Sequence, residues 1–409
     1  MKRLVFLLSL GLFLLASAVH ADPVTVPNGP WVQPDQTVQL QKFYTIEELG
    51  KKLFDIEAHS KGRLKVEVAG YSATLNYPIY VAKFGEPDAD KTRIYIQSSI
   101  HGDEQIHTNA CVELIQTLAT SGNKDILDIL DNETIWIVPM LNPDGNMFTL
   151  DDGTLWPQRL NVQTWTPTDW GLPADFVAPF YYSSRYGVYG FDLNRDFNPN
   201  LDFVLNPNTN NVPRGSSRES GFFVAPESRA SAALFKALEP DLFLDLHMQY
   251  PTYAQSTTDN GMNTLQLLAI ATLDTGYTDK DGNVFPLDPE VLKLSKQVCA
   301  LVYQGLTANG KSLWGNIGRY APINYPGSAL GAFQLNGSAI TLFEFRGGSI
   351  FDNGQKGSGM LIAQCLEGLR IILMGFSTGD VYNVDPDIYD NVIPSSGPRV
   401  RKPHPEPQP

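Results

Sequence analysis

Hydrophobic positions change their period between segments of this chain, from the spacing of helices to the alternation of strands. From Phe43 onward, residues 44–58 place apolar side chains at helical spacing. Thr45 is a candidate capping residue, since the third residue after it is Glu48. Residues 63–68 then alternate between apolar and polar side chains, which predicts a half-buried strand.

The same two patterns recur in turn along most of the remaining chain. Short apolar runs predict strands at residues 78–84, 93–100, 134–140, 241–247 and 339–345. Longer segments with helical spacing predict helices at residues 103–118, 226–238, 288–307 and 357–374. Strands that alternate with helices predict an α/β fold: a single domain with a mixed, largely parallel twisted sheet covered by helices on both faces.

Three long stretches interrupt this alternation, at residues 148–190, 198–221 and 249–285. Connections this long in a compact domain are usually functional loops or disordered segments, and the many aromatic residues of the first favour an ordered rim. Residues 394–409 contain six prolines and are predicted to be a disordered tail, with a short interaction arm as the alternative.

The N-terminal residues have the pattern of a secretory signal. Lys2 and Arg3 precede an apolar stretch at residues 4–15, and a cut after Ala21 has small or apolar residues at positions −3 and −1. An uncleaved anchor is the alternative, but the apolar stretch is shorter than the roughly 20 residues that a spanning helix needs. We predict a signal at residues 1–21, an N-terminal arm at 22–42 and a folded domain at 43–393, with no other membrane-spanning segment.

Composition and charge narrow the class of protein. The chain has 409 residues, of which 43% are hydrophobic and 18% charged, and this predicts a folded globular protein. The net charge is −14, and it becomes −16 when the two positive and no negative residues of the signal are removed. An acidic protein of this kind lacks the broad basic surface that nucleic acids require. We expect a secreted or periplasmic protein with no nucleic-acid partner.

The cysteines and histidines are few. Cys111, Cys299 and Cys365 lie in predicted helices, and they form at most one disulfide, with buried thiols as the alternative. Of six histidines, one lies in the signal and one in the tail, and His59 is at the polar end of the first helix. His107 lies inside a predicted helix and is expected to be structural.

The two other histidines lie where strands are predicted to end. His101 follows a strand directly, and Glu104 is three residues further, across a strand-to-helix turn, so both can face one point. His247 ends a second apolar strand, and ligands bind at the carboxyl ends of strands in open α/β sheets. Two imidazoles and a carboxylate with an open fourth position are typical of catalytic zinc. The alternative for each histidine is a capping or core role.

Further motifs follow in a fixed order, although each alone is plausible as a turn. The chain resembles the zinc carboxypeptidases of the carboxypeptidase A type, and the resemblance spans residues 43–374. It depends on the ordered motifs His101-Gly-Asp-Glu104, Asn142-Pro-Asp-Gly145, Asp192-Leu-Asn194-Arg195, Pro226-Glu-Ser-Arg229, Asp245-Leu-His247 and Phe343-Glu-Phe-Arg346.

The resemblance implies one zinc ion bound by His101, Glu104 and His247. It implies that Glu344 is the catalytic glutamate, for which the alternative is a strand-end residue paired with Arg346. A carboxylate near the metal is what this hydrolysis requires, because bound water must lose a proton that then passes to the leaving amine.

The resemblance also assigns residues that bind the substrate. Asn194 and Arg195 match residues that grip the substrate's terminal carboxylate, and Asp192 matches a carboxylate that orients a ligand histidine. Aligning on Trp156 puts a proline where the family has its oxyanion-stabilising arginine, so Arg159, two residues later, is the candidate, with a surface arginine as the alternative. Tyr325 best matches the mobile tyrosine that closes over the substrate.

The function implied is that of a secreted zinc metallocarboxypeptidase that removes residues from the free C-terminus of peptides. The family's pocket floor falls between Tyr325 and Glu344, and residues 328–339 contain no charged side chain, which favours a neutral or apolar terminal residue over a basic one. The stretch between residues 21 and 43 is too short for a folded pro-domain, so we expect an enzyme that is active without one. We also expect a monomer.

Two alternatives remain open. A deacylase or peptidoglycan stem-peptide peptidase would use the same zinc core, and export suits a cell-wall substrate. A catalytically inactive binding protein would retain the fold, but the presence of all three ligand candidates and Glu344 argues against it.

Overall fold

The computed structural model describes residues 43–175, 181–183, 187–204, 219–255, 261–307, 314–347 and 355–399. The predicted signal and N-terminal arm, at residues 1–42, lie outside the described residues. So does the end of the chain from residue 400.

The centre of the molecule is an eight-stranded sheet with the strand order β1-β2-β4-β3-β7-β12-β8-β11. Most of its strands are rich in β-branched and aromatic residues, which fit a pleated buried surface. The strands are β1 (Lys65–Tyr71), β2 (Pro78–Phe84), β3 (Thr92–Ser98), β4 (Glu133–Val138), β7 (Leu242–Gln249), β8 (Asn263–Leu268), β11 (Asn316–Arg319) and β12 (Ala339–Arg346). Two small hairpins pair β5 (Tyr181–Ser183) with β6 (Tyr189–Phe191), and β9 (Tyr277–Thr278) with β10 (Val284–Phe285).

The four central strands β4, β3, β7 and β12 run parallel, so their carboxyl ends meet at one edge of the sheet. Antiparallel strands flank this block, β2 beside β4 and β8 beside β12. The register places Glu344 between His247 on one neighbouring strand and Gln266 on the other. The predicted mixed α/β sheet is therefore confirmed, and the four parallel strands end at the same edge.

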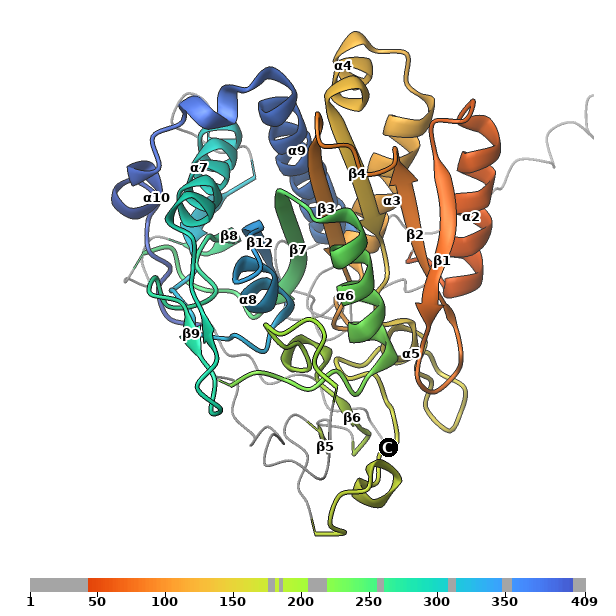
Figure 1. Cartoon of the computed structure of the whole chain (residues 1–409). Helices are drawn as coiled ribbons and strands as arrows, with labels where there is room; N and C mark the ends of the chain where they lie inside the picture. Colours follow the sequence, from red (N-terminus) through yellow and green to blue (C-terminus); the bar gives the residue numbers. More distant parts are fainter. Residues whose placement is uncertain are drawn as a thin grey trace, which may run out of the picture.

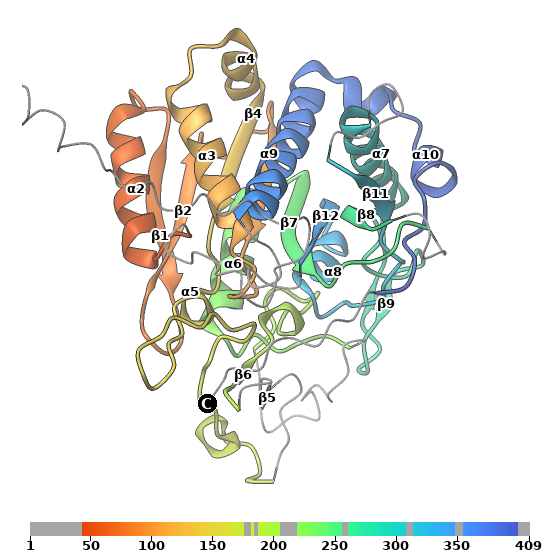
Figure 2. The ribbon, with the colours of Figure 1, turned by 180° about the vertical axis from the view of Figure 1, so that it is seen from behind.

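Helices cover both faces of the sheet (Figures 1 and 2). Helices α2, α3, α7 and α9 pack on one face and α6 and α8 on the other. The helices are α2 (Ile46–His59), α3 (Ile106–Thr120), α4 (Lys124–Asn132), α5 (Pro143–Asn146), α6 (Pro226–Leu238), α7 (Pro289–Leu306), α8 (Ala329–Gln334), α9 (Gln355–Thr378) and α10 (Asp387–Asn391), with 3₁₀ turns η2 (Pro167–Trp170), η3 (Leu193–Arg195) and η7 (Asp380–Asn383).

Local sequence signals explain where several helices begin. Thr45 and Glu48 form the expected capping box at the start of α2. Asp288 caps α7 and is followed by Pro289, whose missing N–H costs nothing in the first turn. Pro226 occupies the same first position in α6.

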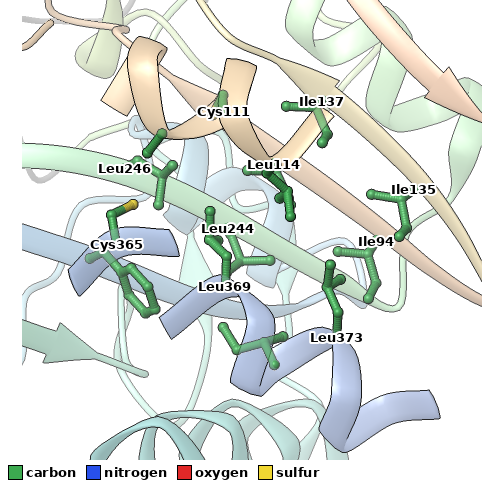
Figure 3. Close-up of a cluster of buried hydrophobic side chains, with 14 of the residues drawn as sticks. Ile94, Cys111, Leu114, Ile135, Ile137, Leu244, Leu246, Cys365, Leu369 and Leu373 are labelled. Carbon is green, nitrogen blue, oxygen red and sulfur yellow. The ribbon is translucent and has the colours of Figure 1, made fainter. Parts of the chain in front are cut away.

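The larger core lies between the sheet and the helices α3 and α9 (Figure 3). Leu114 of α3 and Leu369 of α9 meet the strand residues Ile94, Ile135 and Leu244 in this layer. Strands β4, β7 and β8 are buried along their whole length. Burial on both faces explains why their sequences are runs of apolar residues more than strict alternations.

One helix of the described residues bears on the expectation that no membrane span follows the signal. Residues Gly357–Thr378 of α9 are long and apolar enough to cross a membrane by length and composition, although no span was expected after the signal. Half of the most apolar part of this helix is buried, and its buried residues include Leu361, Leu369 and Leu373. In this structure α9 is a helix of the core.

Two segments interpreted as irregular are ordered parts of the sheet region. The predicted loop at residues 249–285 contains the fully buried strand β8, which pairs with both β12 and β11. The prediction of a disordered tail from residue 394 is also wrong for residues 394–399. The backbone of these residues forms hydrogen bonds with Arg319 and Tyr253. Both segments are fixed by partners distant in the sequence.

The aromatic stretch at residues 148–190 forms an ordered rim where the structure describes it. Trp165 packs against Tyr181 and Phe191, with ring centroids 5.9 and 6.0 Å apart. The three cysteines are buried and free, in α3, α7 and α9.

Candidate metal centre and cavity

The turn after β3 brings His101 and Glu104 to the carboxyl edge of the sheet. Ser99 adopts a left-handed backbone conformation, with φ of 52°, and its hydroxyl donates to the carbonyl of Glu104 at 3.2 Å. Such conformations cost energy outside glycine and occur often at functional sites. Gly102 packs so closely against the backbone of Asn146 that a Cβ would lie 2.3 Å from its nitrogen. The motif's glycine therefore permits contact with the Asn-Pro-Asp-Gly turn.

His101, Glu104 and His247 converge on one point. The two Nδ1 atoms are 3.2 Å apart, and the Glu104 carboxylate oxygens lie 2.8 Å from Nδ1 of His101 and 3.2 Å from Nδ1 of His247. Tetrahedral zinc with ligands at about 2.0–2.2 Å places ligand atoms roughly 3.3–3.6 Å apart. The observed separations are slightly shorter, so this donor set fits a zinc ion with little adjustment.

Each histidine has a carboxylate behind it. Nε2 of His101 lies 3.3 Å from Asp192, and Nε2 of His247 lies 2.9 Å from Asp245. Metal-binding histidines commonly use their second nitrogen in this way, which fixes the ring and its tautomer. When both imidazoles are neutral, the carboxylates of Glu104, Asp192 and Asp245 and the guanidinium of Arg159 have a summed charge of minus two. That charge suits a divalent cation.

The buried charges around this point shift one another's pKa. Burial alone would raise the pKa of Glu104, but His101 and His247 hold it below its ordinary value. Burial likewise opposes ionisation of His247, yet Asp245 and Glu104 raise its pKa well above the ordinary value. The close approach of the Glu104 carboxylate to the imidazoles contributes to both shifts.

Arg159 is placed at this centre by backbone contacts. Its carbonyl accepts bonds from the backbone N–H of Gly102 at 3.4 Å and the side chain of Asn142 at 3.2 Å. Its guanidinium bonds Asp192 through two nitrogens at 3.1 and 3.2 Å, and a third nitrogen lies 3.2 Å from Nδ1 of His101. The structure thus places the arginine candidate beside the metal ligands and not at an unrelated surface.

The segment at Asp192 presents the next three candidates on one 3₁₀ turn. The carboxylate of Asp192 accepts from the backbone N–H of Asn194, which makes Asp192 the cap of η3. The Asn194 amide nitrogen lies 3.4 Å from His247, while its oxygen accepts from the N–H of Ala329 at 3.0 Å. Asn194 therefore connects a metal-ligand candidate to the start of α8.

Arg195 and Tyr325 meet across the cavity. The guanidinium carbon lies 4.6 Å from the centre of the Tyr325 ring, a cation–π contact. The Tyr-Pro-Gly-Ser turn that carries Tyr325 ends in Ser328, whose hydroxyl accepts from Gly331 and caps α8. Gly331 itself has no room for a side chain, since a Cβ would lie 2.1 Å from the carbonyl oxygen of Tyr325.

Glu344 lies at the end of β12, one strand away from His247. It is 8% exposed, and burial raises the pKa of its carboxyl above the ordinary value. An acid of this kind holds a proton more readily near neutral pH, as proton transfer requires.

These side chains line one cavity of about 470 Å³. It contains the candidates His101, Glu104, Arg159, Asn194, Arg195, His247, Tyr325 and Glu344. Asp192 lies behind them, bonded to His101 and Arg159. All the candidate site residues are therefore brought together.

The cavity also includes residues that the sequence did not identify. Tyr182 reaches Asp192 with its hydroxyl at 3.4 Å, and Tyr320 and Arg399 also line the cavity. Tyr182 lies in the stretch at residues 148–190 that was predicted to form an ordered rim, so the sequence offered a signal for this residue. Arg399 lies in the segment predicted to be disordered, where no sequence signal marked it.

Two motif carboxylates support the scaffold outside the cavity. Asp144 accepts bonds from the hydroxyl of Ser72 and the backbone of Thr74 and Leu75, at 2.6–3.0 Å. Glu227 accepts from the N–H of Ala73 at 3.0 Å, and burial raises its pKa to about 7. Both hold the β1–β2 connection against the rest of the domain.

His107 is buried in the core and lies outside the cluster of three. Its ring centroid is 5.3 Å from that of Phe345, and burial lowers its pKa to about 3. It is a neutral core side chain at physiological pH, as expected from its place in the helix.

The sequence is similar to known peptidases. A family model described as zinc carboxypeptidase matches residues 51–263. The chain is 26% identical over 171 residues to mast cell carboxypeptidase A of Mus musculus, covering 40% of this chain and 35% of that protein. It is 31% identical over 135 residues to carboxypeptidase E of Caenorhabditis elegans, covering 31% and 24%. These alignments thus span about a third or less of the length of either relative.

Solved structures share the fold. Carboxypeptidase A from Helicoverpa armigera matches with a TM-score of 0.54 at 17% identity, covering 91% of this chain and 81% of that one. Bovine thrombin-activatable fibrinolysis inhibitor, solved with tick carboxypeptidase inhibitor, matches with a TM-score of 0.53 at 16% identity, covering 84% and 99%.

Proposed function

The chain belongs to the zinc carboxypeptidase family, and from this membership we propose that it is a secreted metallocarboxypeptidase that hydrolyses the C-terminal peptide bond of peptides. The observation that carries the proposal is the convergence of His101, Glu104 and His247 in the cavity that also contains Glu344 and Arg195. That combination supplies a metal site, a proton carrier and an anion-binding group together.

The metal site fits one zinc ion, held by His101, Glu104 and His247. When bound there, zinc lowers the pKa of a coordinated water and polarises the scissile carbonyl. Asp192 and Asp245 hold the two imidazoles in the orientation that exposes Nδ1 to the ion.

Glu344 is the general base and then the general acid. Its carboxylate accepts a proton from the attacking water and donates it to the nitrogen of the leaving amino acid. Arg159 stabilises the negative charge that develops on the carbonyl oxygen, because its guanidinium lies beside His101. Asp192 keeps that guanidinium fixed before the substrate arrives.

Arg195, Asn194 and Tyr325 bind the free terminal carboxylate. A guanidinium presents paired N–H donors that suit a carboxylate, and the Tyr325 ring lies against that guanidinium. This requirement for a terminal carboxylate is what restricts cleavage to the last peptide bond. We further propose that residues 1–21 direct export to the periplasm or outside the cell and that the enzyme acts as a monomer.

The test uses the protein purified without residues 1–21, with zinc measured per chain. Two peptides of the same sequence are compared, one with a free C-terminus and one amidated, together with an N-acylated amino acid. We expect about one zinc per chain and release of the terminal residue from the free peptide alone. Preferred hydrolysis of the acylated amino acid would favour the deacylase, and zinc binding without any hydrolysis would favour an inactive binding protein.

A further inference from the structure

The described end of the chain, residues 394–399, forms a strap between the edge of the sheet and the cavity. Near β11, the N–H of Arg319 donates to Pro394 at 2.7 Å and the N–H of Ser396 donates to the carbonyl of Arg319 at 3.0 Å. Further along, Gly397 and Pro398 exchange backbone bonds with Tyr253 at 2.8 and 3.0 Å. The strap is therefore fixed on both sides.

Gly397 allows the strap to lie this close. A Cβ at this position would be 1.8 Å from the carbonyl oxygen of Gln255, so no other residue fits without moving the backbone. Arg399 follows two residues later and pairs with Thr252 in an antiparallel bridge. Its position is thus set by the strap's backbone.

Arg399 lines the same cavity as the candidate catalytic residues. Its guanidinium donates to the hydroxyl of Tyr320 at 2.9 Å. Tyr320 follows β11, which lies on the side of Glu344 opposite to His247 in the strand order. Arg399 therefore approaches from the side away from the metal ligands.

The three cavity arginines differ in how their charge is balanced. Arg159 is paired with Asp192, whereas Arg195 stacks on Tyr325 and Arg399 bonds a neutral hydroxyl. Within the described part of the chain, neither Arg195 nor Arg399 has a carboxylate at ion-pair distance. Two guanidinium groups thus line the cavity without a carboxylate at ion-pair distance among the described residues, and the terminal carboxylate of a peptide accounts for one.

We infer that Arg399 binds the acidic side chain of a C-terminal glutamate or aspartate, so that the enzyme prefers peptides with a dianionic terminal residue. The inference rests on the proposed carboxypeptidase function. Tyr320, Ile323 and Leu342 also line the cavity, and Glu344 is the carboxyl on which Arg399 acts, opposing the rise in its pKa that burial causes. A carboxylate in that setting gains a charged hydrogen bond that an amide of the same shape does not.

This inference changes the specificity expected from the sequence. Residues 328–339 indeed contain no charged side chain, but Arg399 of the strap brings a positive charge to the cavity. The segment between Tyr325 and Glu344 therefore does not decide the preference alone.

The test compares four peptides that are identical except for a terminal Glu, Gln, Leu or Lys, with the zinc-loaded enzyme. Glu and Gln have the same shape, so their ratio of kcat/KM isolates the charge. We expect Glu to exceed Gln by about 10-fold to 100-fold, the range of a charge-assisted hydrogen bond, and Lys to be the poorest substrate.

Three variants locate the effect. Arg399→Gln should reduce the Glu-to-Gln ratio to near 1 while kcat/KM for Gln and Leu changes less than about threefold. Gly397→Val should reduce the ratio similarly, because it displaces the strap. Arg370→Gln is the matched control: Arg370 is an exposed arginine of α9 that pairs with Glu367, and the ratio should not change.

The outcomes separate this inference from the proposed function. If no peptide is hydrolysed, the proposed function fails. If all are hydrolysed but Glu does not exceed Gln, or if Arg399→Gln lowers all four equally, the function stands and the role of Arg399 is overturned.

Discussion

The cavity has two sides that are built differently. The metal half consists of His101, Glu104, His247, Asp192 and Arg159, and the substrate half of Arg195, Tyr320, Tyr325 and Arg399. Glu344 lies on the strand between them.

In the metal half, the residues lie after β3, at the end of β7 or on turns that pack against these two strands. Each charged side chain there has a partner of opposite charge. Arg159 pairs with Asp192, and each histidine has a carboxylate behind it. In the substrate half, Tyr320 and Tyr325 come from connections and Arg399 from the strap, and the two arginines lack a carboxylate partner among the described residues. A resident ion needs a site that is rigid and already shaped, whereas a substrate that comes and goes must bring the missing charge itself.

The largest expected effect comes from removing a ligand of the metal half. His247→Ala should lose zinc, and peptide hydrolysis should fall to that of the metal-free protein, because two donors cannot hold the ion well. Metal content by mass spectrometry and the rate on a free-terminus peptide are the measurements. His59→Ala, an exposed histidine of α2, is the control, and full zinc occupancy in His247→Ala would refute the ligand role.

Glu344→Gln should separate the proton carrier from the metal half. We expect zinc to be retained and kcat/KM to fall by roughly 10²–10⁴, the usual contribution of general acid–base catalysis. Glu290→Gln, on the exposed start of α7, should behave like the wild type. Near-normal hydrolysis by Glu344→Gln would remove this residue from the mechanism.

Asp192→Asn tests whether the charge balance of the metal half matters. It should weaken zinc binding by roughly 10-fold to 100-fold, because His101 and Arg159 lose the charge that holds them. Competition with a chelator measures the affinity, and Asp202→Asn, an exposed partner of Lys236, is the control. An unchanged zinc affinity would mean that the carboxylate is not needed.

Arg195→Gln tests the substrate half without touching the metal. Zinc affinity should stay the same, while kcat/KM for a free-terminus peptide falls by about 10-fold to 100-fold through loss of a charged contact. Slow cleavage of the amidated peptide, where detectable, should be unaffected. If both peptides slow equally, Arg195 does not read the terminal carboxylate.

The smallest effect on turnover concerns Glu227, which supports the scaffold beneath both halves. Burial raises its folded-state pKa to about 7, so the folded protein binds a proton more tightly than the unfolded chain. Its stabilising contribution is therefore complete below the unfolded pKa near 4.5 and is lost as the pH rises through about 7.

Glu227→Gln has no such titration. Relative to the wild type, its free energy of unfolding should improve by about 1–3 kcal/mol between pH 4.5 and pH 8. Denaturant unfolding at several pH values measures this, with the exposed Glu239→Gln as control. A constant difference between variant and wild type would contradict the raised pKa.

The sequence alone predicted most of the metal half because its signals are local. His101 and Glu104 share one turn, and His247 ends an apolar run whose composition predicts a buried strand. Parallel strands have their carboxyl ends at the same edge of a sheet. Predicting the strands was therefore enough to predict that these residues lie close together. Even the arginine candidate, displaced from the family's position, lies only two residues after Pro157, which aligns with that position.

The motif positions that the sequence left without a role became clear only in three dimensions. Asp144 and Glu227 belong to the motifs that carried the resemblance, yet their partners, such as Ser72 and Ala73, lie about 70 and 150 residues away. No local pattern distinguishes a carboxylate that holds a backbone from one that binds a ligand.

What the sequence determined by itself was six of the eight strands of the sheet, the helices α2, α3, α6, α7 and α9, and the chemistry at three strand ends, since their hydrophobic periodicity is clear. What only the tertiary structure decided was which distant segments meet. Strand β8 is polar enough at its start to read as loop and gains its place by pairing with β12 and β11. The strap reads as disordered because prolines and small residues bury little alone. It is held by backbone bonds to Tyr253, more than a hundred residues earlier, and so brings Arg399 to the cavity.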